Sequence, residues 1–257
     1  MNLITSRDNP HLKAIRRLTQ DSAAYRKQGQ FWLEGDHLCR AAKVRGVKPL
    51  QVVLSESFWH EQGQEWADLG AKLLVLPDAL FGSLSSLESP ARMGCVLAWT
   101  ADTDVLPDVP TVVLDRVQDA GNVGAILRCA SAFGYRQVLA LQGTAALWSH
   151  KVLRAGMGAH FGLKLVEGLD ESALDALRVP LLVTSSHQGP YLHELQANQG
   201  LPRICAWVMG HEGQGVRDSL MARAQRHVRI AQPGGEESLN VATAAAICLH
   251  ASATSGV

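Results

Sequence analysis

Residues 111–128 read Thr-Val-Val-Leu-Asp-Arg-Val-Gln-Asp-Ala-Gly-Asn-Val-Gly-Ala-Ile-Leu-Arg. The first five, Thr111 to Asp115, form a short β-branched run that is typical of a buried parallel strand. A loop with glycine and asparagine follows, and the small and apolar residues after it predict a helix through residues 123–133. A strand that leads through such a loop into a helix is the unit from which mostly parallel α/β sheets are built.

The rest of the C-terminal half repeats this alternation. Further strands are predicted at residues 137–141, 181–184, 203–209 and 226–230, and a last helix at 241–253. We therefore expect an α/β domain whose mostly parallel sheet is covered by helices on both faces. Because ligands bind beyond the carboxyl ends of the strands in such sheets, the loops that follow these strands should carry the chemistry.

The N-terminal half predicts a smaller α/β domain. Strand-like runs lie at residues 30–34, 50–54, 73–76 and 94–99, with helical stretches between them. Residues 101–110 are acidic, carry two prolines and are interpreted as a linker. We therefore expect domains at residues 1–100 and 111–257.

Charge is unevenly distributed along a chain whose net charge is zero. Residues 1–50 hold ten basic and four acidic residues, a net charge of +6, whereas residues 51–110 hold two basic and nine acidic residues, a net charge of −7. A basic N-terminal face suits contacts with nucleic-acid phosphates, although a solvated helix surface explains the same charges.

Cysteines and apolar runs indicate the setting of the protein. The five cysteines are scattered and form no Cys-x-x-Cys pair, which argues against a disulfide framework and against a metal site. The chain has no apolar run of about 18 residues and no signal-peptide pattern at its start. We therefore expect a cytoplasmic protein without a membrane segment or a metal.

The first loop after a predicted strand holds Asn122, which is either a plain helix N-cap or a site residue. Arg128 lies near two helical turns further along. Its sequence neighbours are small or apolar, so we expect its guanidinium to need an anion or a carboxylate partner, and the alternative is a surface salt bridge.

The second loop, residues 210–215, reads Gly-His-Glu-Gly-Gln-Gly and either brings its backbone close to a ligand or merely connects a strand to a helix. Glu212 suits a ribose or a basic group as partner, and His211 is interpreted as a solvent-facing loop residue. In the third loop, Ser238 or Asn240 is expected to cap the last helix, a role that requires no other function. Because the three loops follow strands of one sheet, they should converge at one edge.

Together the three loops resemble the motifs of the SpoU (TrmH) group of SPOUT methyltransferases. The matching segments, in the family's order, are Asn122-Val-Gly-Ala-Ile-Leu-Arg128, Met209-Gly-His-Glu-Gly-Gln-Gly215, and Ile230-Ala-Gln-Pro233 with Glu237-Ser-Leu-Asn-Val241. The resemblance covers residues 107–257, and the third motif departs from the family in its shifted proline. Residues 4–10 and 31–35 resemble, more loosely, the L30e-like substrate-binding domain found before many SpoU catalytic domains.

The resemblance implies a fold and an activity. It implies an S-adenosylmethionine-dependent RNA methyltransferase that modifies a ribose 2′-hydroxyl, with a C-terminal trefoil knot and a homodimeric assembly. It further implies a structured RNA partner docked on the N-terminal domain. Because that domain is large, 23S ribosomal RNA is favoured, and transfer RNA stays open as an alternative substrate.

The resemblance also implies roles for individual residues. Those expected in catalysis are Arg128, Asn122, Glu212, Ser238 and Asn240. Those expected to contact the cofactor are Gly210, Ile230, Leu239, Thr184 and Ser185. A side chain at position 210 is expected to fill the space of the adenosine. The motif-one arginine is expected to bind the RNA phosphate beside the target ribose, and either that phosphate or a transiently neutral guanidine takes the proton of the hydroxyl.

Two other classes of protein share this fold class. A non-catalytic RNA-binding assembly factor would be free to lose the catalytic motif residues, all of which are present. A nucleotide-dependent oxidoreductase would need a Gly-x-Gly-x-x-Gly fingerprint with an acidic residue about 20 positions further on, and glycines at 210, 213 and 215 do not match that spacing.

Overall fold

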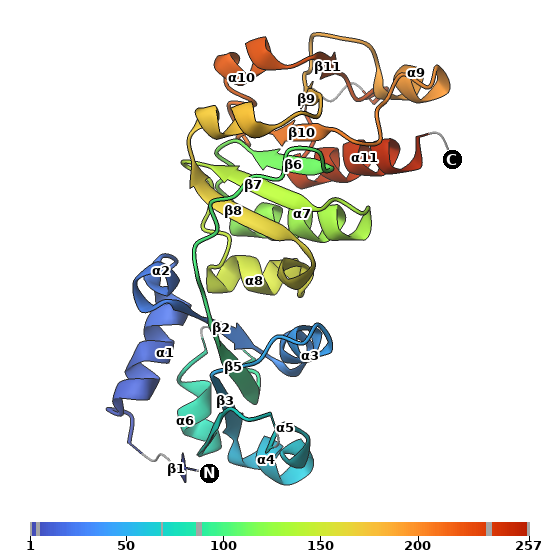
Figure 1. The fold of residues 1–257 in the computed structure, drawn as a ribbon. Helices are drawn as coiled ribbons and strands as arrows, with labels where there is room; N and C mark the ends of the chain where they lie inside the picture. The colour runs from blue at the N-terminus through green and yellow to red at the C-terminus, as the bar shows by residue number, and fades with distance from the viewer. Residues whose placement is uncertain (1, 4–5, 68, 86–88, 235–237, 256–257) are drawn as a thin grey trace. The chain divides into compact units, whose positions relative to one another are not determined.

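The computed structural model describes residues 2–3, 6–67, 69–85, 89–234 and 238–255. Ile4, Thr5 and Glu237 of the motifs quoted above lie outside these residues. The chain forms two compact units, each with its own sheet (Figure 1). Unit 1 comprises Met1–Ala101 and Trp148–Phe161, and unit 2 comprises Asp102–Leu147 and Gly162–Val257.

Unit 1 is built on a mixed five-stranded sheet with the order β1-β4-β3-β5-β2. Its strands are β1 (Asn2–Leu3), β2 (Gln30–Glu34), β3 (Gln51–Ser55), β4 (Lys72–Leu76) and β5 (Met93–Ala98). Its helices are α1 (Pro10–Gln20), α2 (Ala24–Gln28), α3 (Asp36–Val44), α4 (Glu56–Gln62), α5 (Gln64–Ala67), α6 (Asp78–Gly82) and α8 (His150–Gly156). The predicted alternation of strands and helices in the N-terminal domain is confirmed, because each predicted strand lies within one residue of an observed one.

The first helix of unit 1 shows how local sequence sets an element. Asn9 caps α1, since its side chain accepts a hydrogen bond from the His11 backbone at 2.9 Å, and Pro10 occupies the first turn. Leu12, Ile15 and Leu18, spaced to share one helical face, are all buried.

Helix α8 belongs to unit 1 although it lies inside the range expected to form the C-terminal domain. The buried carboxylate of Glu34, at the end of β2, lies 3.0 Å from Nε2 of the buried His150. The ring of Trp148, just before α8, packs on Phe31 with centroids 4.8 Å apart. Burial raises the pKa of Glu34, but hydrogen bonds from His150 and Ser85 hold it below its usual value. Deleting residues 1–100 would therefore remove the packing partner of α8.

Unit 2 contains a six-stranded sheet with the order β11-β9-β10-β6-β7-β8, in which every pair of neighbours is parallel. Its strands are β6 (Thr111–Leu114), β7 (Gln137–Leu141), β8 (Lys164–Leu169), β9 (Leu181–Thr184), β10 (Ala206–Met209) and β11 (Arg226–Val228). Its α-helices are α7 (Ala120–Ala132), α9 (Leu192–Ala197), α10 (Asp218–Arg223) and α11 (Val241–Thr254), and it contains the 3-10 helix η2 (Glu171–Ala176). The 3-10 helix η1 (Ala159–Gly162) belongs to unit 1 except for its last residue. The predicted α/β fold with a mostly parallel sheet is confirmed.

Helices cover both faces of this sheet. On one face, Val113, Val183 and Val208 pack in a single cluster with Leu174 of η2 and Leu220 of α10. On the other, α7 and α11 lie side by side (Figure 1).

Strand β8 was not predicted, because it lies at an edge, where Glu167 and Gly168 interrupt its apolar run and its pairing with β7 shifts register. Within the described residues, no helix has both the length and the apolar character needed to cross a membrane.

One buried hydrogen bond fixes α11 on the sheet. Nε1 of Trp207 on β10 donates to Oγ of Ser252 on α11 at 2.9 Å, and both residues are fully buried. Ser252→Ala would leave the indole N–H without this partner. We expect the free energy of unfolding, measured by urea denaturation, to fall by about 1–3 kcal/mol.

The matched control is Thr254→Ala, because the Thr254 hydroxyl is exposed and donates only to carbonyl groups within α11. We expect this control to change stability by less than about 0.5 kcal/mol. A Ser252→Ala protein as stable as the wild type would contradict the role of the hydrogen bond.

Candidate active site

Four adjacent parallel strands, β11, β9, β10 and β6, end at one edge of the unit 2 sheet, so the loops that follow them converge there. The edge holds a pocket of about 360 Å³. Its lining includes all the residues expected to contact a cofactor, which are Thr184, Ser185, Gly210, Ile230 and Leu239. Glu212 and Ser238 line it as well. The structure therefore brings together segments that lie far apart in the sequence.

The chemical character of this pocket suits S-adenosylmethionine. Its volume falls in the range of about 300–1,000 Å³ that is typical of small-molecule sites. Hydroxyl groups of Thr184, Ser185 and Ser238 line it together with apolar side chains such as Ile230 and Val241. The cofactor combines a flat apolar purine with a ribose and a charged amino-acid group, so it needs both kinds of surface.

Gly210 is required for a reason that was not predicted from the sequence. A Cβ atom there would lie 2.3 Å from the backbone carbon of Gly215 and 2.3 Å from the nitrogen of Val216. The clash would be with the returning arm of the same loop, so it arises before any ligand is considered. This arm is fixed by paired backbone hydrogen bonds between His211 and Gly215, of 3.0 and 2.8 Å. The glycine thus lets the loop fold back on itself.

His211 fixes the same loop and is only partly exposed. Its Nδ1 atom accepts hydrogen bonds from the backbone nitrogens of Gly213 at 2.9 Å and Gln214 at 3.2 Å. The interpretation of His211 as a solvent-facing residue is therefore wrong in part, since its ring closes the turn.

Glu212, Asn122 and Asn240 form one chain of hydrogen bonds across the three loops. Oε1 of Glu212 accepts from Nδ2 of Asn122 at 3.1 Å, and Oδ1 of Asn122 accepts from Nδ2 of Asn240 at 2.9 Å. The Glu212 carboxylate also accepts from the backbone nitrogens of Gln118 and Asp119, at 3.1 and 3.0 Å. Desolvation raises the pKa of Glu212, but these backbone and side-chain donors hold it below its usual value. The carboxylate is therefore ionised at neutral pH and acts as an acceptor.

The helix caps differ in part from the expectation. Asp119, not Asn122, caps α7, since its side chain accepts from the Asn122 backbone nitrogen at 2.8 Å and the helix begins at Ala120. The side chain of Asn122 is thereby free to bond to Glu212. Asn240 does cap α11, because its Oδ1 accepts from the backbone nitrogens of Ala242 and Thr243. Ser238 makes no cap and is exposed in the pocket lining.

Arg128 lies on α7 with its side chain exposed. It makes no hydrogen bond or ion pair with any residue that the structure describes. Of the expected anion or carboxylate partner, the described residues supply no carboxylate, because the apolar neighbours Ile126 and Leu127 point into the core while Arg128 faces solvent. Its guanidinium is accordingly available to an external anion.

Sequence reasoning missed a buried carboxylate, Asp115, that ties the first loop to the second. Asp115 is fully buried, and its Oδ1 lies 3.1 Å from Nε of Arg116 and 2.7 Å from Nε of Arg217. Burial raises the pKa of Asp115, but both guanidinium groups hold it below its usual value. A charged residue directly after an apolar strand was the available signal, because a buried charge must be paired.

Arg116 forms a second bridge to the glycine loop. Its Nη1 donates to Oε1 of Gln214 at 2.8 Å and its Nη2 lies 3.5 Å from the Gly215 carbonyl oxygen. Its φ of 59° is uncommon for a residue other than glycine, so its side-chain contacts offset a backbone cost of about 1–3 kcal/mol.

Comparison with known proteins identifies the family. Residues 110–250, more than half of the chain, match the model of the SpoU rRNA Methylase family. The chain belongs to this family. In this SpoU family protein, residues 9–94 also match the model of the MRM3-like substrate binding domain. These matches confirm the predicted family and its N-terminal substrate-binding domain.

Similar proteins agree with this assignment. The chain is 28% identical to the Bacillus subtilis 23S rRNA (guanosine(2553)-2′-O)-methyltransferase RlmP, over 87% of this chain and 88% of that protein. It is 32% identical to an uncharacterized tRNA/rRNA methyltransferase of Synechocystis, over 96% of this chain and 92% of that protein. The AdoMet-bound rRNA methyltransferase of Sinorhizobium meliloti superposes with a TM-score of 0.83 and 25% identity, over 98% and 97% of the two chains. The predictions of an RNA methyltransferase and of S-adenosylmethionine as cofactor are confirmed.

The clash at position 210 yields a test. Gly210→Ala should force the glycine loop out of place, at a cost of about 1–3 kcal/mol, so the affinity for S-adenosylhomocysteine measured by calorimetry should fall roughly tenfold or more. In the matched variant Gly213→Ala, the new Cβ would meet only the His211 ring, at 3.8 Å, so binding should be retained. Equal affinities of the two variants would refute the role of the tight turn.

Proposed function

We propose that this protein transfers a methyl group from S-adenosylmethionine to a ribose 2′-hydroxyl of 23S ribosomal RNA. One observation carries the proposal. The pocket that gathers the expected cofactor residues is hydrogen-bonded, through Glu212 and Asn122, to the helix that carries Arg128, whose side chain has no hydrogen-bond or ion-pair partner among the described residues. The names of the relatives, which include a 23S rRNA (guanosine-2′-O-)-methyltransferase of Bordetella pertussis, favour the large ribosomal RNA as substrate.

The proposed chemistry places few demands on the protein. S-adenosylmethionine, when bound, supplies a methyl group that its sulfonium already activates. The side chains therefore have to position the ribose hydroxyl and assist the loss of its proton. Arginine is almost entirely protonated at neutral pH and makes a poor base, so Arg128 first binds the phosphate beside the target ribose. Either that phosphate or a transiently neutral guanidine accepts the proton.

The other site residues fall into two groups, those whose side chains already bond within the protein and those whose side chains are available to a ligand. Asn122, Asn240 and Glu212 use their polar atoms on one another and on backbone amides, so we assign them to positioning the loops. Ser238 makes no hydrogen bond with the described residues, and its hydroxyl lines the pocket. Ser238 is therefore the side chain that we assign to the ribose hydroxyl.

The proposal extends to assembly and topology. A trefoil knot is supported by the strand order β11-β9-β10-β6 and by the packing of the C-terminal helix α11 on α7. A homodimer is supported by the partly exposed Ile247 among the small residues of α11. A cytoplasmic location, where ribosomal RNA is the partner, agrees with five cysteines that are all free. We also propose RNA docking on the domain at residues 1–100, supported by its basic first half and its family match.

Arg128→Ala tests the assignment of the catalytic arginine. Its single-turnover rate of methyl transfer to 23S ribosomal RNA, with products identified as 2′-O-methylnucleosides by mass spectrometry, should fall at least about 100-fold. Its affinity for S-adenosylhomocysteine should stay within about twofold of the wild type, because Arg128 does not line the pocket.

The matched control is Arg136→Ala, which removes the same charge from another exposed position in unit 2. This variant should keep most of the transfer rate. Wild-type rates in Arg128→Ala would exclude Arg128 from the reaction, and transfer by the wild type to transfer RNA alone would replace the proposed substrate.

A further inference from the structure

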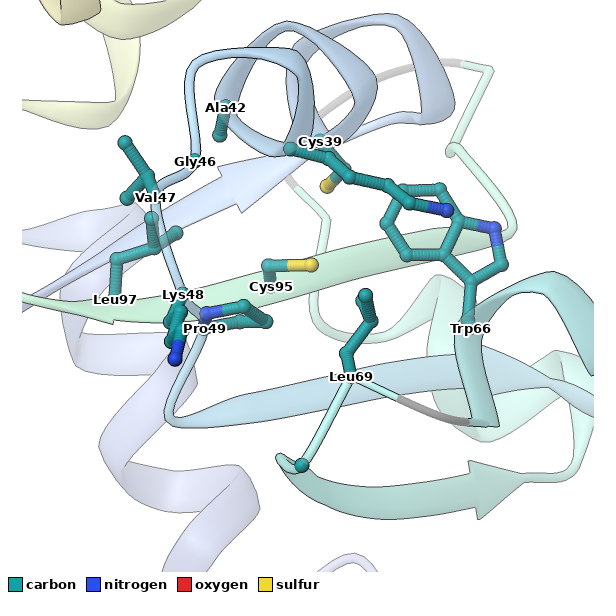
Figure 2. Close-up of a pocket in the computed structure, with 12 residues that line it drawn as sticks. Cys39, Ala42, Gly46, Val47, Lys48, Pro49, Trp66, Leu69, Cys95 and Leu97 are labelled. Atoms are coloured by element: carbon teal, nitrogen blue, oxygen red, sulfur yellow. The ribbon is translucent and has the colours of Figure 1, made fainter.

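Unit 1 contains a cavity of about 450 Å³ that the proposed reaction does not use (Figure 2). Three parts of unit 1 surround it. They are α3 with the loop that leads to β3, the end of α5 with the residues after it, and strand β5. The lining residues are Cys39, Ala42, Lys43, Gly46, Val47, Lys48, Pro49, Trp66, Leu69, Gly70, Cys95 and Leu97. All of them belong to unit 1.

The interior of this cavity is apolar. Ala42 and Val47 lie on one side of it and Trp66 on the other, with Cys95 between them (Figure 2). Ala42, Trp66 and Cys95 are each at most 4% exposed, so they form a fixed wall. Burial, with Cys95 beside it, raises the pKa of Cys39 well above its usual value, so this thiol is neutral and behaves as an apolar group.

The rim of the cavity is basic. Residues 43–48 read Lys-Val-Arg-Gly-Val-Lys and contain three cations without an acidic residue. The ammonium group of Lys43 is engaged within the protein. Its Nζ lies 5.1 Å from the centre of the Trp66 ring and 3.3 Å from a carboxylate oxygen of Glu65. Arg45 and Lys48 are exposed, and neither side chain makes a hydrogen bond or an ion pair within the part of the chain that the structure describes. Val44, between these cations, is 87% exposed.

An apolar cavity beside cations that have no intramolecular partner is suited to binding an unpaired nucleotide. Proteins that read single-stranded RNA bury splayed-out bases against apolar and aromatic side chains and bind the adjoining phosphates with basic ones. An apolar side chain of a protein partner would fill the cavity but would leave Arg45 and Lys48 unmatched. The cavity also lies in the range of residues 9–94 that matches a substrate-binding domain.

We propose that this cavity receives one unpaired base of the RNA substrate, with the phosphates of that nucleotide on Lys48 and Arg45. The inference rests on the proposed function, because it takes RNA to be the substrate. Few polar side chains face the interior, so the pocket selects an unpaired nucleotide by shape and tolerates different bases. Substrate RNA is thereby anchored at a point of unit 1 that is separate from the cofactor pocket.

Filling the cavity tests this proposal. In the full-length protein, Val47→Trp should occupy the cavity and weaken binding of a 23S ribosomal RNA transcript about tenfold, in line with the loss of one buried base. The control Val47→Ala leaves the cavity open and should bind nearly as the wild type does. Both variants should bind S-adenosylhomocysteine with unchanged affinity, which shows that unit 2 is intact.

A surface variant covers the case in which Val47→Trp does not fold. Lys48→Glu should weaken RNA binding and lower the slope of log affinity against log salt by about one or more, as expected for a lost phosphate contact. Lys151→Glu on α8 makes the same charge change at an exposed position of unit 1 that lies outside the cavity and outside the basic first half, and it should leave both quantities nearly unchanged. Photo-crosslinking of a transcript that contains 4-thiouridine should label peptides that include residues 39–49.

The outcomes separate the two proposals. A wild-type protein that methylates 23S ribosomal RNA, while Val47→Trp and Lys48→Glu bind it as tightly and no crosslink falls in the cavity, overturns the base pocket alone. A wild-type protein that binds S-adenosylhomocysteine but neither binds nor methylates RNA overturns the proposed function and the base pocket together.

Discussion

The cofactor pocket depends on one carboxylate, that of Glu212. The loop with glycines at 210, 213 and 215 is closed on itself by hydrogen bonds of His211, but these bonds do not fix its position relative to the other two loops. Glu212 supplies that constraint, because its two oxygens accept hydrogen bonds from two backbone nitrogens and one amide of the neighbouring loop. Since Asn122 also binds Asn240, the constraint extends to the start of α11 and so to the third loop.

A second constraint lies directly beneath the first. Asp115 follows β6, is fully buried and pairs with Arg116, at the start of the first loop, and with Arg217, directly after the glycine loop. Breaking such a buried pair leaves an uncompensated charge in the interior. The loops around the pocket are thus tied together by a buried group of paired charges and by a chain of hydrogen bonds, and Arg128 takes part in neither. In the proposed function, this division separates cofactor binding from the capture of the RNA phosphate.

The fold of unit 2 and the meeting of its loops at one edge were predictable from local patterns, and the residues of the pocket from the resemblance to the SpoU family. Apolar runs located β6, β7, β9, β10 and β11, and motif residues at strand ends then had to meet at one edge. Contacts between distant segments were not predictable in the same way. The attachment of α8 through Glu34 and His150, and the backbone reason for Gly210, depend on residues that meet only in the folded chain.

The N-cap of α7 could not be predicted from its local sequence either. Asp119 and Asn122 both have side chains that cap helices. Asp119 makes the cap, and the Asn122 side chain bonds instead to Glu212, a residue distant in the sequence. The basic segment 43–48 is the opposite case. Its charges were visible in the sequence, but the apolar cavity beneath them is formed by β5 and the end of α5, which lie far along the chain.

The most direct test of this account is the calorimetric affinity of Asn122→Ala for S-adenosylhomocysteine. Asn122 does not line the pocket, so its side chain can influence the ligand only by holding the loops. The account predicts that affinity falls about five- to tenfold, which corresponds to roughly 1 kcal/mol for the lost hydrogen bonds. An affinity equal to that of the wild type would show that the chain from Glu212 through Asn122 to Asn240 does not maintain the pocket.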